Sequence, residues 1–480
     1  QRSFYFNEYN QNLFYKKKNN ILNINQDRVY VLFFIFFCLI FIFAVKIFFV
    51  SLKNYDSENY LKNYNNFKPL RNDIVDRNGD YIARNIPVYH VAVKPNLIKD
   101  KKKFIIKLKL LDTTLNFKKV ENKLKKNNYF YLKKNLTLDE KNKFWSLGEK
   151  GLIFEITQTR IYPHKNLFSH VIGQIDNDNN GISGIEKSFD NSLKESNQQL
   201  KLTVDLNLQY LIREELLKYQ NIFNTIGSAA ILMNSRNGEI LSLLSLPDYD
   251  LNKRQTLKDK NLINRATKGV YELGSVFKTF TYAAGLNEGY INPNTEFKNL
   301  EKKIYCSKFP IGEYDEKIPS DLTAEQILIR SGNIGSVRIA QKLGIDKFKN
   351  FLIKLGLLNK LDFDIQEVGD PGSLTWGKCK LATTSFGHGI TTTLINLAKA
   401  YAIISNGGTD IEPTLIKKKE NREKKKRILD KKVSEQLNLI LRKVVSSKEG
   451  TAGFANISGY EVGGKTGTAQ KVLNGDYTKE

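Results

Sequence analysis

The sequence predicts an α+β protein with three parts: one N-terminal transmembrane helix, an irregular module after it, and a larger domain in which helices back a sheet. The first observation is a nearly unbroken apolar run over residues 29–50. The second is a pair of short apolar runs, residues 229–233 and 240–246, on either side of an Asn-Gly turn, which is typical of a β-hairpin. The third is the dominance of helical patterns over residues 275–405, between these early strands and a later one.

The apolar run has the length and composition of a membrane anchor. Val29–Val45 is almost purely apolar, and Ile47–Val50 extends the run to about the ~20 residues that a spanning helix needs. Phe and Ile dominate it and it lacks a small-residue cleavage site, so we expect an anchor rather than a signal peptide. The basic residues before it are Arg2, Lys16, Lys17, Lys18 and Arg28.

These basic residues predict the orientation of the chain by the positive-inside rule. We expect residues 1–28 to be a cytoplasmic tail and residues 29–50 to cross the inner (cytoplasmic) membrane once. Everything after about residue 51 would then be periplasmic, or extracytoplasmic in general.

Two modules are expected outside the membrane. Residues 51–199 form an irregular pedestal, and its lysine- and asparagine-rich middle could be a small α/β lobe or partly mobile. From residue 200 the pattern sharpens: Asp205 can cap a helix that runs through Tyr219 with leucines on its apolar side. Residues 200–480 are expected to form the second, larger domain.

The segment Ser275-Val276-Phe277-Lys278 offers a nucleophile and a base. The pattern predicts a helix from Ser275 to Glu288, closed by Gly289, with Ser275 in its first turn and Lys278 on the same face. A serine hydroxyl needs a neighbour to take its proton, and a lysine can do so only if burial or a second cation lowers its pKa. Lys465 is the expected second cation. An ordinary amphipathic helix with an exposed lysine remains the alternative.

The segment Ser331-Gly332-Asn333 follows a helix-like run, Thr323–Arg330. It offers a hydroxyl and an amide to the first segment if the loop folds over it. Taken alone, the segment favours a polar turn between two helices.

The segment Val462–Gln470 predicts a glycine-rich strand at the edge of the site. Its glycines allow a ligand to approach the backbone closely, and its threonines favour an extended chain with which a substrate could pair. The same stretch satisfies the phosphate-loop pattern GxxxxGK[ST] between Gly459 and Thr466. No apolar strand precedes that pattern and no helix signal follows it, so we do not expect a nucleotide site.

Composition argues against nucleic acid, metals and cofactors. The net charge is +25 because 75 Lys and Arg face 50 Asp and Glu, but the excess accompanies a chain-wide enrichment in lysine and asparagine and no nucleic-acid-binding motif is present. The four histidines are scattered, so no metal is indicated.

Of the three cysteines, Cys38 lies in the membrane run, while Cys306 and Cys379 could pair or stay free.

Taken together, the chain resembles the class B penicillin-binding proteins, the monofunctional peptidoglycan transpeptidases. The short gap between Gly173 and Gly181 is most similar to the cell-division (septal) branch. The segments that carry the resemblance are residues 71–79, 160–163, 170–173, 181–186, 264–278 and 464–471.

The resemblance implies a penicillin-binding, serine-β-lactamase-like transpeptidase domain and a role for each residue. Ser275 would attack the carbonyl of the penultimate D-alanine of a D-Ala-D-Ala stem peptide, and Lys278 would take its proton. Ser331 would relay a proton to the leaving D-alanine. Asn333 would hold the substrate amide and the lysine. β-Lactams would acylate Ser275 in place of the substrate.

The third segment would bind the substrate. Lys465, Thr466 and Thr468, with Gly467 between them, would hold the terminal carboxylate. The backbone N–H groups of Ser275 and Thr468 would form the oxyanion hole. A histidine in a matching turn, Gly387-His388-Gly389, is expected to be structural.

Other functions share some of these features. A β-lactam sensor or a β-lactamase has the three segments but would not explain residues 71–79 and 160–186. An elongation-type transpeptidase remains an alternative, as does a non-catalytic membrane scaffold of the division complex, against which an intact Ser275 and Lys278 argue. The expected partners are stem peptides, a glycosyltransferase and membrane proteins of the division complex. The resemblance also implies further strands and a terminal helix, so residues 1–480 alone are expected to be poorly stable and inactive.

Overall fold

The computed structural model describes residues 29–49, 51, 70–196, 198–253, 260–417, 426–470, 472–473 and 476–477. The chain divides into two units, Gln1–Lys68 and Pro69–Glu480. In the first unit, the helix Val29–Phe49 has 21 residues and a mean hydropathy of 3.0, so it is long and apolar enough to cross a membrane. The expected cytoplasmic tail, residues 1–28, lies outside the described residues.

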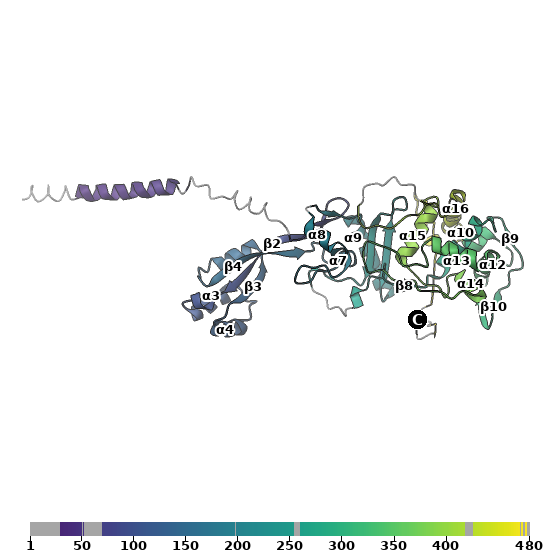
Figure 1. Ribbon diagram of the computed structural model, residues 1–480, viewed down its shortest axis with the longest axis horizontal. Coiled ribbons are helices and arrows are strands. Elements are labelled where there is room, and N and C mark those ends of the chain that lie inside the picture. Colours follow the sequence, from purple (N-terminus) through teal and green to yellow (C-terminus); the bar gives the residue numbers. More distant parts are fainter. Residues whose placement is uncertain are drawn as a thin grey trace, which may run out of the picture. The chain divides into compact units, whose positions relative to one another are not determined.

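The pedestal at the start of the second unit is built on a five-stranded sheet (Figure 1). The long strand β2 pairs with β1 near its start and with β3 and β4 along its later part, and its register with β4 runs from Arg84 opposite Ile161 to Val93 opposite Leu152. Strand β5 joins the same sheet parallel to β1, so the chain re-enters the pedestal at residue 200, where the second domain was expected to begin. The strands are β1 (Ile74–Val75), β2 (Tyr81–Val93), β3 (Phe130–Leu136), β4 (Leu152–Ile161) and β5 (Leu200–Lys201).

The lysine-rich middle of the pedestal is a small α/β lobe. Three helices begin at side chains that accept a hydrogen bond from the first turn: Asp100, Asn116 and Thr137. Their apolar faces meet the sheet in a separate core that includes Phe104 and Leu108, both fully buried. The first of the two possibilities left open by the sequence is therefore correct. The lobe contains η1 (Pro95–Leu97), α3 (Lys101–Leu111), α4 (Phe117–Lys125) and α5 (Leu138–Trp145).

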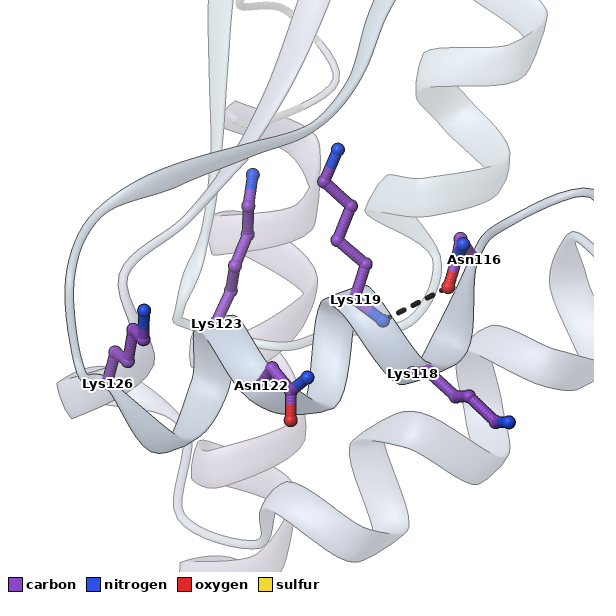
Figure 2. Close-up of a pocket in the computed structure, with 6 residues that line it drawn as sticks. All are labelled: Asn116, Lys118, Lys119, Asn122, Lys123 and Lys126. Atoms are coloured by element: carbon purple, nitrogen blue, oxygen red, sulfur yellow. Dashed lines mark hydrogen bonds between the residues drawn. The ribbon is translucent and has the colours of Figure 1, made fainter.

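A shallow depression of about 450 Å³ lies on this lobe at α4. Four lysines surround it, and at the helix cap the backbone N–H of Lys119 donates to the side chain of Asn116 (Figure 2). Neither a nucleophile nor a carboxylate lines it. The depression is therefore a basic surface feature, with none of the chemistry that the sequence places at residues 275–278. Its lining residues are Asn116, Lys118, Lys119, Asn122, Lys123 and Lys126.

The predicted hairpin forms as β6 (Ser228–Met233) and β7 (Ile240–Leu246), which pair antiparallel. The hairpin packs between α9 (Leu206–Phe223) and α15 (Leu394–Ser405) (Figure 1). Asp205 caps α9 as expected, by accepting hydrogen bonds from the backbone of Asn207 and Leu208, although the helix continues four residues beyond Tyr219 to Phe223. Part of the expected apolar side of α9 faces solvent, including Leu211.

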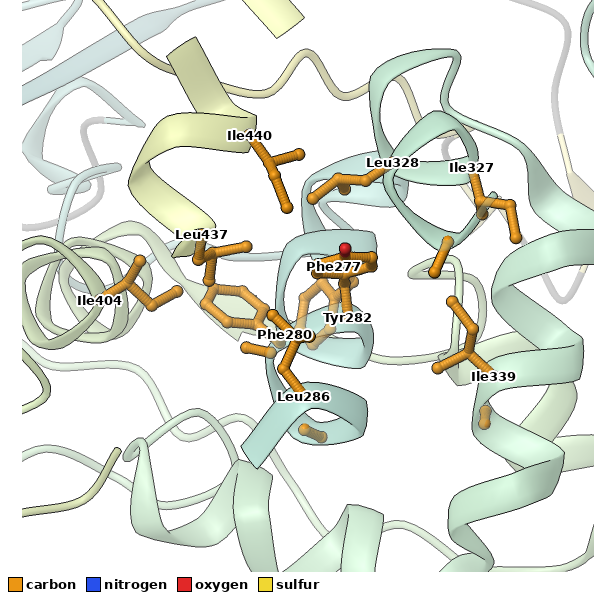
Figure 3. Close-up of a cluster of buried hydrophobic side chains, with 14 of the residues drawn as sticks. Phe277, Phe280, Tyr282, Leu286, Ile327, Leu328, Ile339, Ile404, Leu437 and Ile440 are labelled. Carbon is orange, nitrogen blue, oxygen red and sulfur yellow. The ribbon is translucent and has the colours of Figure 1, made fainter. Parts of the chain in front are cut away.

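Helix α10 lies at the centre of the main core (Figure 3). Phe277, Phe280 and Tyr282, in and just before this helix, are at most 1% exposed, and they pack among isoleucines and leucines of α11, α12 and α16. A helix held on several sides leaves Ser275 at its start little freedom to move. The helices of this domain are α10 (Lys278–Asn287), α11 (Ala324–Ile329), α12 (Asn333–Leu343), α13 (Ile345–Lys354), α14 (Lys378–Thr384) and α16 (Lys431–Ser446).

Short antiparallel pairings complete the domain. They join β8 (Val270–Tyr271) to β13 (Thr392–Thr393), β9 (Glu296–Phe297) to β12 (Leu322–Thr323), β10 (Lys303–Cys306) to β11 (Phe309–Gly312), and β14 (Val472–Leu473) to β15 (Asp476–Tyr477). The remaining short helices are α6 (Ser169–Ile172), α7 (Gly184–Ser188), α8 (Asp190–Glu195), η2 (Lys260–Leu262), η3 (Gly274–Phe277) and η4 (Gly453–Ala455).

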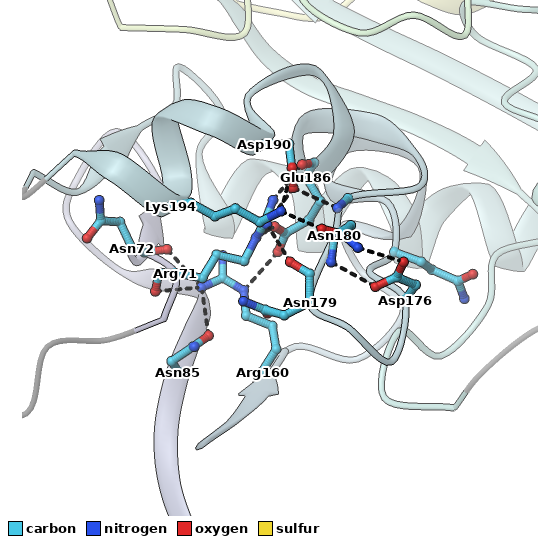
Figure 4. A network of polar contacts seen from close by, with 12 residues as sticks. Arg71, Asn72, Asn85, Arg160, Asp176, Asn179, Asn180, Glu186, Asp190 and Lys194 are labelled. Carbon is cyan, nitrogen blue, oxygen red and sulfur yellow. Dashed lines mark hydrogen bonds and ion pairs between the residues drawn. The ribbon is translucent and has the colours of Figure 1, made fainter. Parts of the chain in front are cut away.

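Three sequence segments that carried the family resemblance meet in one buried polar network (Figure 4). Glu186 accepts hydrogen bonds from Nε of Arg71 at 2.6 Å and from Nε of Arg160 at 2.8 Å, and its side chain is fully buried. Arg71 also pairs with Asp190 at 2.6 Å. Arg160 donates to the backbone carbonyl of Asn72. One polar network therefore joins the three signatures, at residues 71–79, 160–163 and 181–186.

Two expectations about local structure are wrong. The helix predicted from Ser275 to Glu288 is divided, because a 3₁₀ turn, η3, carries Ser275 and the α-helix begins only at Lys278. The strand predicted over residues 462–470 does not form, since none of the described strands pairs with it. That segment instead lies against α16, where Arg442 donates to the carbonyl of Val462 at 3.0 Å.

Candidate active site

Ser275 lies where three separate segments make backbone contact. Gly274 has a φ of 55°, and a Cβ atom there would come within 2.1 Å of the carbonyl oxygen of Thr468. A Cβ atom on Gly387, where φ is 83°, would lie 1.9 Å from the carbonyl oxygen of Gly274. Only glycine fits both places. The turn at Ser275 is thus held between the Lys465-Thr466-Gly467 segment and the Gly387-His388-Gly389 turn.

Lys278 is buried and reaches the second segment. Lys278 is the first residue of α10 and is 2% exposed. Its Nζ atom donates to the carbonyl oxygen of Ser331 and to Oγ of Ser331, the latter at 3.2 Å. Ser331 has a φ of 59°, which is uncommon for a residue with a side chain. No hydrogen bond joins Ser275 to Lys278 among the described residues.

The pKa of Lys278 is lowered to about 7. Burial is the main cause because it disfavours the charged ammonium, and the positive charge of Lys465 adds to it. The carboxylate of Glu313 acts in the opposite direction. A substantial fraction of Lys278 can therefore be neutral near pH 7, as a general base requires.

Lys465 and Thr466 form another wall of the site. The ammonium of Lys465 donates to the carbonyl oxygen of Thr466 at 2.9 Å, and burial lowers the pKa of Lys465 to about 8. Thr466 donates to Oγ1 of Thr451 at 3.0 Å. Since no helix follows Thr466 among the described residues, the phosphate-loop interpretation has no structural support.

A cavity of about 930 Å³ joins these walls. Its size suits a peptide-like ligand, and it opens directly over the Ser275 turn. Six of the eight site residues expected from the sequence line it: Ser275, Ser331, Asn333, Thr466, Gly467 and Thr468.

Asn333 makes a contact that differs from the role implied for it. Its side-chain amide donates to the carbonyl oxygen of Gly312 at 2.7 Å, and no hydrogen bond joins it to Lys278 in the part of the chain that the structure describes. Its backbone N–H donates to the carboxylate of Glu313 at 2.6 Å. The sequence analysis did not identify Glu313, which lies 20 residues before Asn333 and has no local helix-cap signal.

The cysteine pairing that the sequence left open is present. Cys306 and Cys379 form a disulfide, with their Cα atoms 5.4 Å apart. It joins the β10–β11 hairpin, which leads to Glu313, to α14, which leads to the Gly387 turn. The disulfide therefore connects two of the segments that surround the cavity.

The hydroxyls of Ser275 and Ser331 line one cavity, and behind Ser331 lies the buried Lys278, whose pKa is lowered in part by the ammonium of Lys465. This arrangement is suited to acyl transfer through a serine ester. Residues 228–480 match the family described as the penicillin binding protein transpeptidase domain, and residues 66–218 match the penicillin-binding protein dimerisation domain. The chain belongs to the class B penicillin-binding proteins, which are D,D-transpeptidases.

Individual relatives agree with this assignment. The chain is 31% identical over 411 residues to "Probable peptidoglycan D,D-transpeptidase FtsI" of Caulobacter vibrioides, covering 84% of this chain and 69% of the relative. It is 29% identical over 515 residues to "Peptidoglycan D,D-transpeptidase FtsI" of Buchnera aphidicola subsp. Schizaphis graminum, covering 98% and 89%. It is also 29% identical over 459 residues to "Stage V sporulation protein D" of Bacillus subtilis, covering 86% and 70%.

Proposed function

We propose that this transpeptidase cross-links peptidoglycan stem peptides during septal wall synthesis, with Ser275 as its nucleophile. One observation carries the assignment of the nucleophile. The Ser275 turn opens onto the cavity directly before Lys278, the buried lysine whose pKa is lowered to about 7. The two FtsI relatives are named as peptidoglycan D,D-transpeptidases.

The first half-reaction would form an ester. Neutral Lys278 takes the proton of the Ser275 hydroxyl. At the same time, the Ser275 oxygen bonds to the carbonyl carbon of the penultimate D-alanine. The peptide bond to the terminal D-alanine then breaks, and the leaving amine receives a proton from Lys278 through the Ser331 hydroxyl. The 3.2 Å contact between Lys278 and Ser331 supports this path.

The second half-reaction would release the enzyme. The amine of a neighbouring stem peptide attacks the ester carbon and forms a new amide, and the Ser275 oxygen regains a proton. Because the bonds broken and formed are both acyl bonds, no oxidant, metal or nucleotide is needed for the balance. β-Lactams would stop the cycle at the ester.

Substrate binding would use the third segment. Lys465, Thr466 and Thr468, with Gly467 between them, would bind the terminal carboxylate, and Asn333 would hold the substrate amide. The N–H groups of Ser275 and Thr468 would stabilise the oxyanion. The close contact of Gly274 with the Thr468 carbonyl supports the pairing of these two segments.

The candidate span and the disulfide support a proposal for the membrane arrangement. We propose a single-pass protein whose domain after the anchor is extracytoplasmic, since disulfides persist in oxidising compartments and Cys306 and Cys379 are paired.

We propose a glycosyltransferase and division-complex membrane proteins as partners. The alternatives are an elongation-type enzyme and a non-catalytic scaffold.

Covalent labelling with a fluorescent penicillin tests the nucleophile. In the full-length protein, Ser275→Ala should abolish the label, while the control Ser235→Ala, in the turn between β6 and β7, should keep it. A label that survives in a folded Ser275→Ala protein would refute the assignment. A folded parent without label would favour the scaffold alternative. Release of D-alanine from a D-Ala-D-Ala stem peptide, measured in parallel, distinguishes turnover from inhibitor binding.

A further inference from the structure

Glu313 binds the first turn of α12 from a distant part of the chain. Its carboxylate accepts hydrogen bonds from the backbone N–H of Asn333 at 2.6 Å and of Ile334 at 2.9 Å. Gly332, the residue at the cap position, has no side chain to offer. The positive end of the helix is therefore satisfied by a carboxylate from the loop after β11.

This contact lies directly beside Ser331. Ser331 and Gly332 form the turn between α11 and α12, and their N–H groups donate back to Leu328 at 3.2 Å and Ile327 at 2.8 Å. On one side the turn is thus fixed by α11 and on the other by Glu313. Between them, Ser331 keeps its positive φ and presents both its carbonyl and its hydroxyl to Lys278.

The loop that carries Glu313 is itself anchored. Asn333 donates its side-chain amide to Gly312, the residue before Glu313, at 2.7 Å. The β10–β11 hairpin behind this loop is joined to α14 by the Cys306–Cys379 disulfide. The carboxylate therefore approaches α12 from a support that is fixed at two points.

We propose that Glu313 is a positioning residue, which holds Ser331 and Asn333 in place against Lys278 through the first turn of α12. The inference rests on the proposed function, because it concerns the reaction that Ser275 would carry out. Charged hydrogen bonds of this kind are stronger than neutral ones, so a neutral amide replaces them only in part.

The charge of Glu313 also reaches Lys278. It raises the pKa of Lys278, whereas Lys465 lowers it. A residue that only stabilised α12 would not change the pKa of Lys278. The pH dependence of acylation therefore distinguishes a role at the site from a general effect on folding stability. Other charged side chains around the cavity are Asp315, Glu316, Lys317, the Arg330–Glu449 ion pair, and Glu272 beside His388.

The test compares two variants with a matched control in the full-length protein. Glu313→Gln keeps the shape but removes the charge, and Glu313→Ala removes both. Asp205→Asn neutralises another acidic helix cap, at α9. The measurements are the acylation rate by a fluorescent penicillin from pH 5.5 to 9, thermal unfolding, and hydrogen exchange of a peptide covering residues 331–343.

The proposal expects three results together. Glu313→Gln acylates roughly tenfold more slowly at high pH, because the two charged hydrogen bonds to the first turn of α12 are weakened. Its rate reaches half of its maximum at a lower pH than the parent's, since the carboxylate no longer favours protonated Lys278. Exchange over α12 rises in both Glu313 variants. Asp205→Asn loses thermal stability without changing the acylation profile.

Other results overturn it. If Glu313→Gln acylates at the parent rate with an unchanged pH midpoint, Glu313 does not position the site. If both Glu313 variants slow acylation without a pH shift or faster exchange over α12, the effect is one of general stability and the proposal also fails. A folded parent that takes no label is a different failure: it refutes the proposed function, and the positioning role with it.

Discussion

The ammonium of Lys278 lies 3.2 Å from the hydroxyl oxygen of Ser331, a residue 53 positions later in the chain. The proposed base and the proposed proton relay are thus in direct contact. This contact exists because α10 is buried at the centre of the domain while the turn between α11 and α12 folds over its start.

The pH dependence of acylation should report the ionisation of Lys278. Only neutral Lys278 can take a proton, so the acylation rate should rise with pH through a midpoint near the lowered pKa of about 7. In Lys465→Met, the neighbouring positive charge is lost. The pKa of Lys278 then rises, and the midpoint should move to higher pH.

Rates of fluorescent penicillin acylation measured across pH 5.5 to 9 check this prediction. Lys443→Met serves as the control, because Lys443 lies on α16 and pairs with Glu325. It should leave the midpoint unchanged. A midpoint that stays near 7 in Lys465→Met would contradict the assigned effect of Lys465 on Lys278.

Folding stability should also depend on the ionisation of Lys278. Its pKa falls from 10.5 in an exposed lysine to about 7 in the folded protein, so the unfolded chain binds more protons between these values. Stability therefore rises with pH through this range, and Lys278 should contribute about 2–3 kcal/mol of increase between pH 6 and 9. Replacing the side chain with the neutral one in Lys278→Met should remove this contribution.

Urea unfolding of the parent and of Lys278→Met at several pH values measures the difference. The parent should gain stability relative to the variant as the pH rises. A constant difference across this range would show that Lys278 stays charged in the folded protein, as it is in the unfolded chain.

The sequence was sufficient for the features that depend on nearby residues. The β6–β7 hairpin follows from two apolar runs around an Asn-Gly turn. The start of α9 follows from an aspartate at the cap position. The helix after Ser275 also follows from its local pattern, although Ser275 itself lies on the 3₁₀ turn before it. Each of these rests on local geometry or on a motif of known spacing.

Other features depend on residues that are distant in sequence. No pattern near Asn333 indicates that a glutamate 20 residues earlier caps α12. The cysteine pair was compatible with the sequence but was not required by it. The strand expected at residues 462–470 failed because a strand needs a neighbour, and threonine content alone supplies none.

Removing the disulfide should destabilise the domain and slow acylation. Cys306 and Cys379 are separated by 73 residues, so a Cys306→Ala, Cys379→Ala double variant should lose about 3–4 kcal/mol of stability. Acylation should fall as well, because the β10–β11 hairpin that carries Glu313 is released from α14.

Reduction of the parent with a thiol should reproduce the loss of acylation, and the double variant should be insensitive to the same treatment. The control Cys38→Ala, in the candidate membrane helix, should behave like the parent. Unchanged acylation in a reduced, folded parent would show that the hairpin keeps its place without the disulfide.

The last prediction concerns the buried polar network formed by Arg71, Arg160 and Glu186. Both guanidinium groups bind the same fully buried carboxylate, so Glu186→Gln would leave two buried positive charges without their main partner. Breaking a buried ion pair from one side costs about 3–5 kcal/mol, and we expect a loss of this size in urea unfolding. An exposed pair makes the matched control: Glu215→Gln, beside Lys218, should cost less than about 1 kcal/mol.

The network lies among the pedestal segments, whereas Ser275 lies on η3, directly before α10 of the main core. Glu186→Gln should therefore lower stability while folded molecules still take the penicillin label at Ser275 with the parent's pH midpoint. A shifted midpoint would mean that the pedestal controls the ionisation of Lys278. A stability equal to the parent's would mean that Asp190 and the backbone carbonyls suffice to hold both arginines.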